Sequence, residues 1–238
     1  MTDPRPLDGK LALVTGASRG IGAATAEALG KAGAHVILTA RTVSGLEAVE
    51  EAIHAAGGAA TIAPLDLSDL ESIPKLAAAI AERWGSLDIL VLNAAMLGTL
   101  APVEHLELKE MERLFRLNVL ANQQMLQAFN PLLRRAEPAD VVALTSSVGE
   151  TPRAFWGGYG SSKAALDTMM GAYADENERL GKVRVHLIDP GATRTRMRQN
   201  AFPGEEPETV KAPDVVADAI VARLTGDAPA EMRVRVEG

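Results

Sequence analysis

The chain has 238 residues, of which 47% are hydrophobic and 23% are charged, and its net charge is −7. A chain of this length holds one or two domains, and α/β folds often place it in one. The apolar content is close to that of ordinary globular proteins, which excludes disorder as the main state. The acidic balance argues against a nucleic-acid partner. The absence of cysteine excludes disulfides and thiolate metal sites.

No segment has the pattern of a membrane helix or a signal peptide. The longest uncharged apolar run, residues 89–103, is interrupted by Asn93, Gly98 and Pro102, whereas a membrane span needs about 20 apolar residues. Residues 1–10 carry charges and prolines before any apolar stretch. We therefore expect a cytoplasmic protein without a membrane partner. The four histidines are scattered, so we expect no metal site.

Short apolar runs alternate along the chain with longer segments that are apolar every three to four residues, which is the rhythm of βαβ units. Strands are expected at residues 11–15, 35–40, 60–64, 89–93, 141–146 and 183–188, followed by a helix at 214–224 and a short strand at 232–236. This order predicts an α/β fold, a Rossmann-type doubly wound parallel sheet with helices on both faces and a ligand crevice at the carboxyl ends of its strands. We expect a single domain over residues 1–238, with an N-terminal tail at residues 1–9 and a substrate lid at residues 191–210.

A glycine-rich segment, Thr15-Gly16-Ala17-Ser18-Arg19-Gly20-Ile21-Gly22, follows the first expected strand and precedes a helical stretch. Glycines permit a sharp turn and a close approach of backbone amides to a ligand, and the helix N-terminus adds free N–H groups and partial positive charge. An ordinary strand-to-helix turn is the simpler interpretation of these glycines. Their position after the first strand of a doubly wound fold favours a dinucleotide site with the pyrophosphate on this loop.

The end of the second expected strand indicates which dinucleotide is preferred. NAD sites usually place an acidic residue there to bind the ribose 2′-hydroxyl, but this chain has Thr39-Ala40-Arg41-Thr42. The planar guanidinium of Arg41 suits a 2′-phosphate, and Arg19 is a second candidate cation. The alternative is that both arginines are simply solvated. We therefore expect NADP(H) in preference to NAD(H).

Tyr159 and Lys163 are four residues apart in a segment with helical periodicity, so they project from one helix face. Acid–base work by a tyrosine near neutral pH requires its pKa to fall by roughly 3 units, and we expect Lys163 and a cationic nicotinamide to cause much of this shift. The preceding strand ends in Thr145-Ser146-Ser147 at the same crevice. We expect Ser146 to bind the substrate oxygen, with Ser147 as the alternative, while Tyr159 transfers a proton and the cofactor a hydride.

Two groups of residues flank this set. Phe155 and Trp156 directly precede Tyr159 and are candidates for a wall of the substrate pocket. Arg194, Arg196 and Arg198 form a cationic run in the expected lid. These arginines are interpreted either as binding groups for an anionic substrate or as a solvated surface.

Taken in order, these motifs resemble those of the classical short-chain dehydrogenase/reductase family from about residue 10 to residue 197. The glycine segment is similar to the family's T-G-x-x-x-G-x-G, Tyr159-Gly160-Ser161-Ser162-Lys163 matches Y-x-x-x-K, and Ser146 stands 13 residues before the tyrosine. Within the family, residues 147–149, 155–159 and 191–198 look most like the bacterial YciK-type oxidoreductases. The resemblance supplies no physiological substrate.

The resemblance implies further site residues. Asn118 matches the family's asparagine, which completes a catalytic tetrad by holding a water that relays protons through Lys163. Asp66 is expected at the adenine, Lys163 also at the nicotinamide ribose, and the segment at 190–195 at the nicotinamide. Together with the residues argued above, the expected cofactor contacts are Gly16, Ser18, Arg19, Gly20, Ile21, Gly22, Arg41, Asp66, Leu67, Asn93, Ala94, Tyr159, Lys163, Pro190, Gly191, Thr193 and Thr195. The expected substrate contacts are Ser146, Val148, Phe155, Trp156 and Tyr159.

Two segments depart from the family pattern. The family's usual N-N-A-G reads Leu92-Asn93-Ala94-Ala95 here, which predicts a tighter wall on the adenine side. The usual glycine-rich ending is replaced by Arg233-Val234-Arg235-Val236-Glu237-Gly238, which puts in doubt the contacts that this tail makes between subunits in many family members.

The favoured function is an NADP(H)-dependent oxidoreductase that interconverts a carbonyl and a secondary alcohol on a small-molecule substrate. One alternative is a 3-oxoacyl-carrier-protein reductase, which would need a basic patch beside the pocket. Another is a nonenzymatic dinucleotide-binding regulator or scaffold, although the complete set of Asn118, Ser146, Tyr159 and Lys163 argues against it. The helix expected to carry Tyr159 has more small and apolar residues, between positions 164 and 172, than one buried face requires. Together with the resemblance, this predicts a homodimer or homotetramer.

Overall fold

The structure is a computed structural model, and it describes residues 5–178, 181–226 and 232–237. Residues 1–4 of the expected N-terminal tail and Gly238 at the other end lie outside the described residues. The rest of the expected tail is packed against the fold, because Leu7 is buried and its amide donates to the carbonyl of Ala32 over 2.9 Å.

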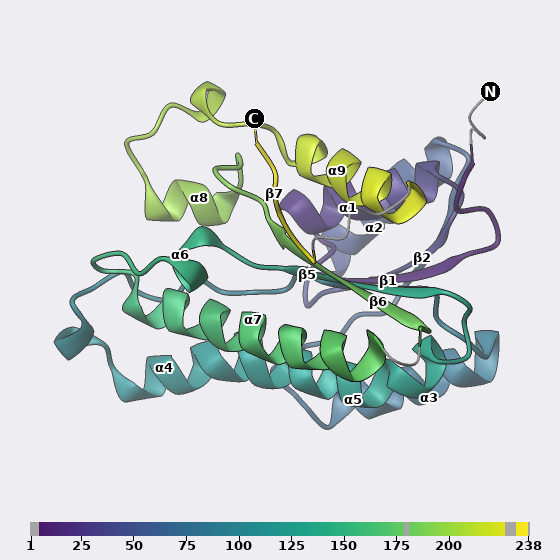
Figure 1. Cartoon of the computed structure of the whole chain (residues 1–238). Helices are drawn as coiled ribbons and strands as arrows, with labels where there is room; N and C mark the ends of the chain where they lie inside the picture. Colours follow the sequence, from purple (N-terminus) through teal and green to yellow (C-terminus); the bar gives the residue numbers. More distant parts are fainter. Residues whose placement is uncertain (1–4, 179–180, 227–231, 238) are drawn as a thin grey trace.

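The described part of the chain forms one sheet of seven parallel strands in the order β3-β2-β1-β4-β5-β6-β7 (Figure 1). The order reverses between β1 and β4, which are neighbours in the sheet although two strands separate them in the sequence. Ligand crevices of doubly wound sheets form at this reversal, at the carboxyl ends of the strands. The strands are β1 (Leu11–Thr15), β2 (His35–Thr39), β3 (Ala59–Ile62), β4 (Ile89–Leu92), β5 (Ala139–Leu144), β6 (Val183–Asp189) and β7 (Arg233–Arg235).

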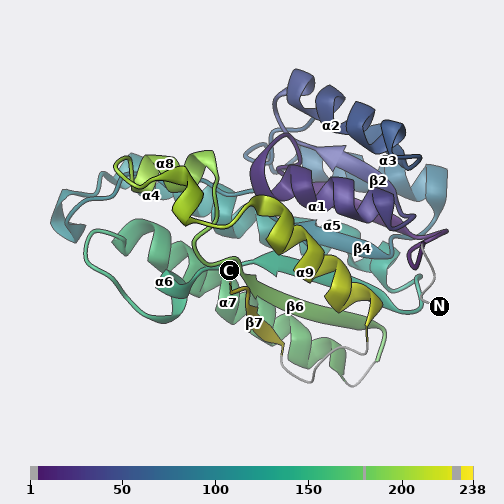
Figure 2. The same cartoon turned by 90° about the horizontal axis from the view of Figure 1, so that it is seen from above.

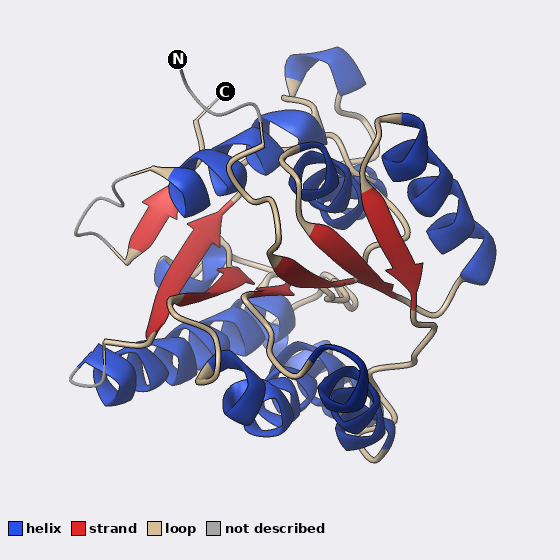
Figure 3. Cartoon of the chain, turned by 90° about the vertical axis from the view of Figure 1, so that its right-hand side faces the viewer, coloured by secondary structure: helices blue, strands red, loops and turns tan. Residues whose placement is uncertain are grey.

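Helices cover both faces of the sheet, so the molecule has three layers (Figures 1 and 3). On one face lie α1 (Gly20–Lys31), α2 (Val43–Ala55) and α9 (Pro213–Thr225). On the other lie α3 (Ser72–Trp84), α4 (Leu108–Phe115), α5 (Ala121–Leu133) and α7 (Gly157–Glu178), with the π-helical turn η2 (Arg116–Leu120) joining α4 to α5. Short helices occupy the loops: η1 (Val103–His105), α6 (Ser147–Glu150), α8 (Arg196–Ala201) and η3 (Pro207–Thr209). From above, α8 overhangs the carboxyl ends of the strands (Figure 2).

Each face of the sheet has its own apolar core, which explains why successive residues of the central strands are mostly apolar. In β1, Leu11 and Leu13 pack into the core under α3, α5 and α7, whereas Ala12 and Val14 pack into the core under α1, α2 and α9. This alternation follows from the two-residue period of a strand. The predicted fold class is therefore confirmed.

The observed strands lie within two residues of the predicted ones, and the largest difference falls at the site. β5 was expected at residues 141–146 but spans Ala139–Leu144. Its last two expected residues leave the strand because the Thr145 side chain turns toward Asp167 of α7 and Ser146 precedes the first turn of α6. Within the described ranges, no helix is long and apolar enough to cross a membrane.

Candidate active site

A cleft of about 1040 Å³ opens at the carboxyl ends of the strands. Its walls come from the loops after the first six strands and from α8. Most of the expected site residues line it, namely Gly16, Ser18, Arg19, Gly20, Ile21, Arg41, Asp66, Leu67, Asn93, Ala94, Ser146, Trp156, Tyr159, Lys163, Pro190, Gly191, Thr193 and Thr195. Segments far apart in the sequence thus converge on one site, as parallel topology requires.

The glycine loop needs its glycines for two different reasons. Gly16 and Gly20 have φ angles of 66° and 58°, in the left-handed region that side chains disfavour. Gly22 is needed for space, since a Cβ there would lie 2.3 Å from the carbonyl oxygen of Gly16 and 2.4 Å from Nδ2 of Asn93. The absence of a side chain at Gly22 therefore lets the start of α1 pack closely against Gly16 and Asn93. Gly22 itself does not line the cleft.

The loop after β4 is tied to the glycine loop by Thr15 and Asn93. The Thr15 hydroxyl donates to the carbonyl of Val91 and accepts from the amides of Asn93 (2.9 Å) and Ala94 (3.1 Å). The Asn93 side chain donates to the carbonyl of Thr15 over 2.8 Å. Leu92, which replaces the family's first asparagine, is buried in the core under α3 and α5. The retained Asn93 thus makes this connection without a second asparagine.

The cleft is positively charged although the chain is acidic. Seven arginines and Lys163 line it against a single carboxylate, Asp66, among the described residues. The lining arginines are Arg19, Arg41, Arg113, Arg116, Arg194, Arg196 and Arg198. Arg19 and Arg41 have exposed side chains, and neither pairs with a carboxylate in the described part of the chain. This arrangement suits an anionic ligand.

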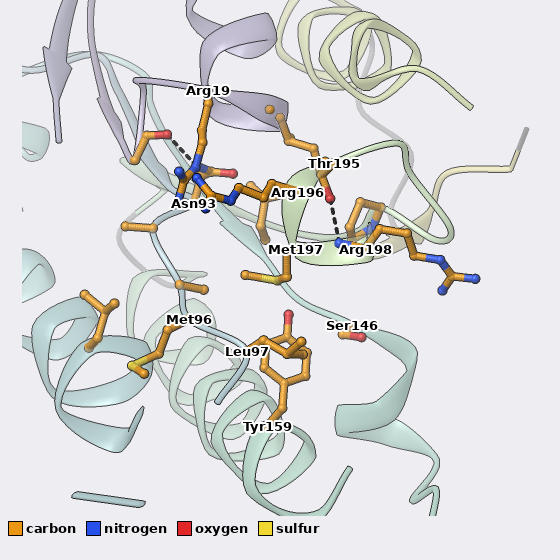
Figure 4. A pocket seen from close by; sticks show the side chains of 18 of the residues that line it. Arg19, Asn93, Met96, Leu97, Ser146, Tyr159, Thr195, Arg196, Met197 and Arg198 are labelled. Carbon is orange, nitrogen blue, oxygen red and sulfur yellow. Dashed lines mark hydrogen bonds between the residues drawn. The ribbon is translucent and has the colours of Figure 1, made fainter. Parts of the chain in front are cut away.

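Tyr159, Lys163 and Ser146 meet at the deep end of the cleft. The Tyr159 hydroxyl and the Ser146 side chain point into the space under Met197 (Figure 4). Nζ of Lys163 is buried, donates to the carbonyl of Leu144 over 2.7 Å and lies 5.7 Å from the centre of the Tyr159 ring. The end of β5 therefore supplies both the candidate serine and the backbone group that holds the lysine.

Burial acts on the two titratable groups in opposite directions. It raises the pKa of Tyr159, and the charges of Asp189 and Asp167 raise it further. Burial lowers the pKa of Lys163 to about 8, against an upward effect of Asp167. Burial and these two carboxylates therefore oppose the decrease in the Tyr159 pKa that acid–base work requires. Positive charge near the tyrosine hydroxyl would act in the opposite direction.

Asn118 is buried behind the cleft, in the π-helical turn η2. Its side chain accepts from the amide of Met96 and donates to the carbonyl of Met96, both over 2.9 Å. It also donates to the hydroxyl of Ser162 over 3.0 Å. Asn118 thus connects α7, beside Tyr159, to the loop after β4.

The structure does not bring two expected substrate contacts to the cleft. Val148 is buried in α6, and Phe155 is 57% exposed with a φ angle of 70°. Trp156 does line the cleft, with its ring 6.1 Å from that of Tyr159 and 5.8 Å from that of Phe202. Adjacent residues at the end of a loop point in different directions, so sequence proximity to Tyr159 was not sufficient.

Several residues that line the cleft or lie next to it were not expected from the sequence. Met96 and Leu97 follow the Asn93 motif and lie near Tyr159 with Met197 (Figure 4). No residue pattern distinguished them, because apolar side chains in loops have no characteristic spacing. Asp167, which contacts Thr145 and affects the pKa of both Tyr159 and Lys163, carried a signal in its position four residues after Lys163.

The three arginines at positions 194, 196 and 198 lie in different environments. Arg194 pairs with Glu208 over 2.7 Å. Arg198 makes two contacts with Glu205, of 2.7 and 2.5 Å, and stacks on the ring of Phe202. Arg196 is exposed and extends toward the glycine loop (Figure 4).

Comparison with known proteins finds close relatives. The family model for short chain dehydrogenases matches residues 10–206. The uncharacterized oxidoreductase YciK of Escherichia coli K12 is 37% identical over 210 residues, which cover 87% of this chain and 82% of YciK. A Shigella flexneri 2a structure assigned to the short chain dehydrogenases and complexed with NADP has a TM-score of 0.89 and 36% identity, covering 94% of each chain. An E. coli CFT073 structure with the same assignment, complexed with NADPH, has a TM-score of 0.92 and 34% identity, covering 99% of this chain and 100% of that one.

The packing behind the glycine loop can be tested with Gly22→Ala. We expect this change to separate Gly16 from Asn93 and to destabilise the protein by about 1–3 kcal/mol, the usual cost of overpacking. Chemical denaturation monitored by circular dichroism measures the change. Gly171→Ala is the control, because it adds a Cβ within a helix where the nearest atom is 4.0 Å away. Equal stability of the two variants would contradict the interpretation.

Proposed function

Because the chain belongs to the short-chain dehydrogenase family and is thereby an oxidoreductase, we propose that it interconverts a carbonyl compound and a secondary alcohol with NADP(H) as its cofactor. The observation that carries the proposal is the meeting of Tyr159, Lys163 and Ser146 in the same cleft as the glycine loop. A proton donor, its buried lysine and a hydroxyl for the substrate oxygen are what carbonyl reduction requires. The proposed substrate is a small molecule.

Two features of the cleft and the ligands of two related structures support NADP(H). The glycine loop and the N-terminus of α1 offer backbone N–H groups to a pyrophosphate. No carboxylate stands at the end of β2, where Arg41 lines the cleft with Arg19 nearby on the glycine loop. The related structures from S. flexneri and E. coli contain NADP and NADPH. We assign the adenine end to Asp66 and Leu67, beside Asn93 and Ala94, and the nicotinamide end to Lys163 and residues 190–195.

The proposed proton path runs through Tyr159. NADP(H), when bound, supplies the hydride to the substrate carbon or accepts it. The Ser146 hydroxyl binds the substrate oxygen, and the Tyr159 hydroxyl gives its proton to that oxygen during reduction and receives it back during oxidation. Lys163 favours the tyrosinate form through its charge. Asn118 completes the tetrad as part of the proton relay, and residues 191–210 act as the lid over the substrate.

The 3-oxoacyl-carrier-protein reductase alternative has less support. An acidic carrier protein would need free cations at the mouth of the cleft. Two of the candidate arginines, Arg194 and Arg198, are instead paired with Glu208 and Glu205. The wall around Trp156 and Met197 is largely apolar, which favours a substrate whose atoms beyond the carbonyl are uncharged.

We also propose that the chain forms a homodimer or homotetramer. Leu108 and Leu120, at the ends of the α4–η2 segment that packs beside α7, are 74% and 48% exposed. Exposed leucines next to a helix rich in small residues favour association with a second copy. Sedimentation velocity should show a species of two or four chains at micromolar concentration. A single species with the mass of one chain, 25.0 kDa, would contradict this expectation.

The assigned proton donor can be tested with Tyr159→Phe. We expect turnover of any carbonyl substrate found in a screen with NADPH to fall by about 10²–10⁴-fold, because the proton donor is lost, while the affinity for NADPH changes little. Tyr173→Phe is the matched control, since this second tyrosine bonds to Asn130 outside the cleft. Turnover by Tyr159→Phe at the level of this control would contradict the mechanism.

The cofactor preference can be tested by fluorescence titration with NADPH and NADH. We expect NADPH to bind at least about tenfold more tightly, a difference of about 1.4 kcal/mol, because Arg41 contacts the 2′-phosphate. Arg41→Ala should remove the difference, and Arg134→Ala, an exposed residue outside the cleft, should retain it. Equal affinities in the unmodified protein would overturn the NADP(H) assignment, and binding of neither dinucleotide would favour the regulator or scaffold alternative.

A further inference from the structure

Three consecutive residues at the end of β5 are held by groups from other elements. The carbonyl of Leu144 accepts from Lys163 over 2.7 Å. The hydroxyl of Thr145 donates to the carboxylate of Asp167. The carbonyl of Ser146 accepts from Arg233 over 3.2 Å. The backbone that presents the candidate serine is therefore attached both to α7 and to β7.

Asp167 lies on the same face of α7 as the candidate catalytic pair, one turn after Lys163 and two turns after Tyr159. Its side chain is 16% exposed, so its charge is only partly screened by water. An unpaired carboxylate at this position would stabilise a protonated Lys163 and an un-ionised Tyr159. The effect on Tyr159 opposes proton release from the tyrosine.

Arg233 pairs with this carboxylate. Its Nη1 lies 2.6 Å from Oδ2 of Asp167, its Nη2 donates to Ser146, and its Nε lies 3.4 Å from the more exposed Glu150 of α6. The residue reaches the site because β7 pairs with β6 and directs Arg233 toward α7 while Val234 and Val236 pack on the opposite face. One side chain from the C-terminal strand thus contacts both the carboxylate beside the Tyr159–Lys163 pair and the backbone of Ser146.

We propose that Arg233 is a positioning residue for the proposed reaction: it neutralises Asp167 beside the Tyr159–Lys163 pair and fixes the backbone of Ser146. The proposal rests on the proposed function for its role in turnover. Its electrostatic part concerns the chain alone and can be measured without substrate or cofactor.

The expected effect follows from the charges that surround the pair. Apart from Asp167 on α7 itself, they are Asp189 at the end of β6, Glu150 in α6 and Arg233 in β7. The adjacent turn η2 contributes the uncharged Asn118, and its Arg116 lines the cleft and donates to the carbonyl of Ser68. Asp167 raises the pKa of Lys163, and burial, the larger influence, lowers it to about 8. Loss of Arg233 leaves Asp167 unpaired and should raise the pKa of Lys163 by on the order of one unit.

The experiment is an NMR titration of protein labelled with ¹³C at the lysine Cε, with the Lys163 signal assigned by its absence from Lys163→Arg. Exposed lysines should titrate near pH 10.4. In the unmodified protein the Lys163 signal should titrate at a clearly lower pH. Arg233→Gln should move its midpoint upward, and Arg233→Lys should largely restore it because a cation remains beside Asp167. Arg235→Gln is the matched control on the same strand, since Arg235 pairs at the surface with Glu237. It should change nothing.

Asp167→Asn distinguishes an electrostatic effect of Arg233 on Lys163 from a structural one. By itself it should lower the pKa of Lys163, because the upward effect of the carboxylate is removed. Combined with Arg233→Gln it should return the midpoint to the unmodified value or slightly below, since no unpaired charge remains. If Arg233→Gln does not fold, Asp167→Asn alone still tests the electrostatic part of the proposal, and a Lys163 midpoint that this change does not lower would overturn it.

Two further results would overturn the proposal. One is an unchanged Lys163 midpoint in folded Arg233→Gln, and the other is a double variant that keeps the shift of Arg233→Gln. Failure of the unmodified protein to bind NADPH would instead count against the proposed function. It would leave the lysine titration interpretable, so the two failures are distinguishable.

Discussion

The site depends on how backbone polar groups are satisfied where the strand order reverses. β1 and β4 are neighbours, but their loops leave the sheet toward different helices, so the groups beyond the strand ends lose their partners in the sheet. The Thr15 hydroxyl and the Asn93 carboxamide replace those partners. Gly16 and Gly22 have no side chains, so the glycine loop and the loop after β4 lie in direct contact. The floor of the cleft is therefore held by hydrogen bonds and close packing together.

The reactive end of the cleft is organised by a different element, the end of β5. Lys163 is buried and its ammonium is held by one backbone carbonyl, so burial brings its pKa to about 8, within reach of physiological pH. Burial and the carboxylates of Asp189 and Asp167 raise the pKa of Tyr159. The charge of Lys163 and, in the oxidised cofactor proposed for this cleft, the cationic nicotinamide would act in the opposite direction.

Charge is distributed unevenly over the molecule. The chain carries a net charge of −7, yet arginines surround the cleft and Asp66 is the one carboxylate among the described lining residues. A positively charged cleft within a protein of negative net charge raises the local concentration of an anionic ligand. The pairing of Arg198 with Glu205, in the segment proposed as the lid, shows that this positive charge is not uniform. Arg19, Arg41 and Arg196, which pair with no carboxylate in the ranges that the structure describes, lie on the side of the glycine loop, where the phosphates are proposed to bind.

The sequence by itself determined the fold class and the strand positions to within two residues. It also identified the glycine loop and the Tyr159–Lys163 pair as candidate parts of the site. These follow from local patterns, since hydrophobic period, glycine spacing and an i, i+4 pair are properties of short segments. Only the tertiary structure decided which side chains reach the cleft. Trp156 lines it whereas the adjacent Phe155 faces solvent, and Arg233, near the end of the chain, reaches Asp167 and Ser146 through the β6–β7 pairing. Contacts of this kind depend on strand order and loop direction, which arise from the packing of the whole chain.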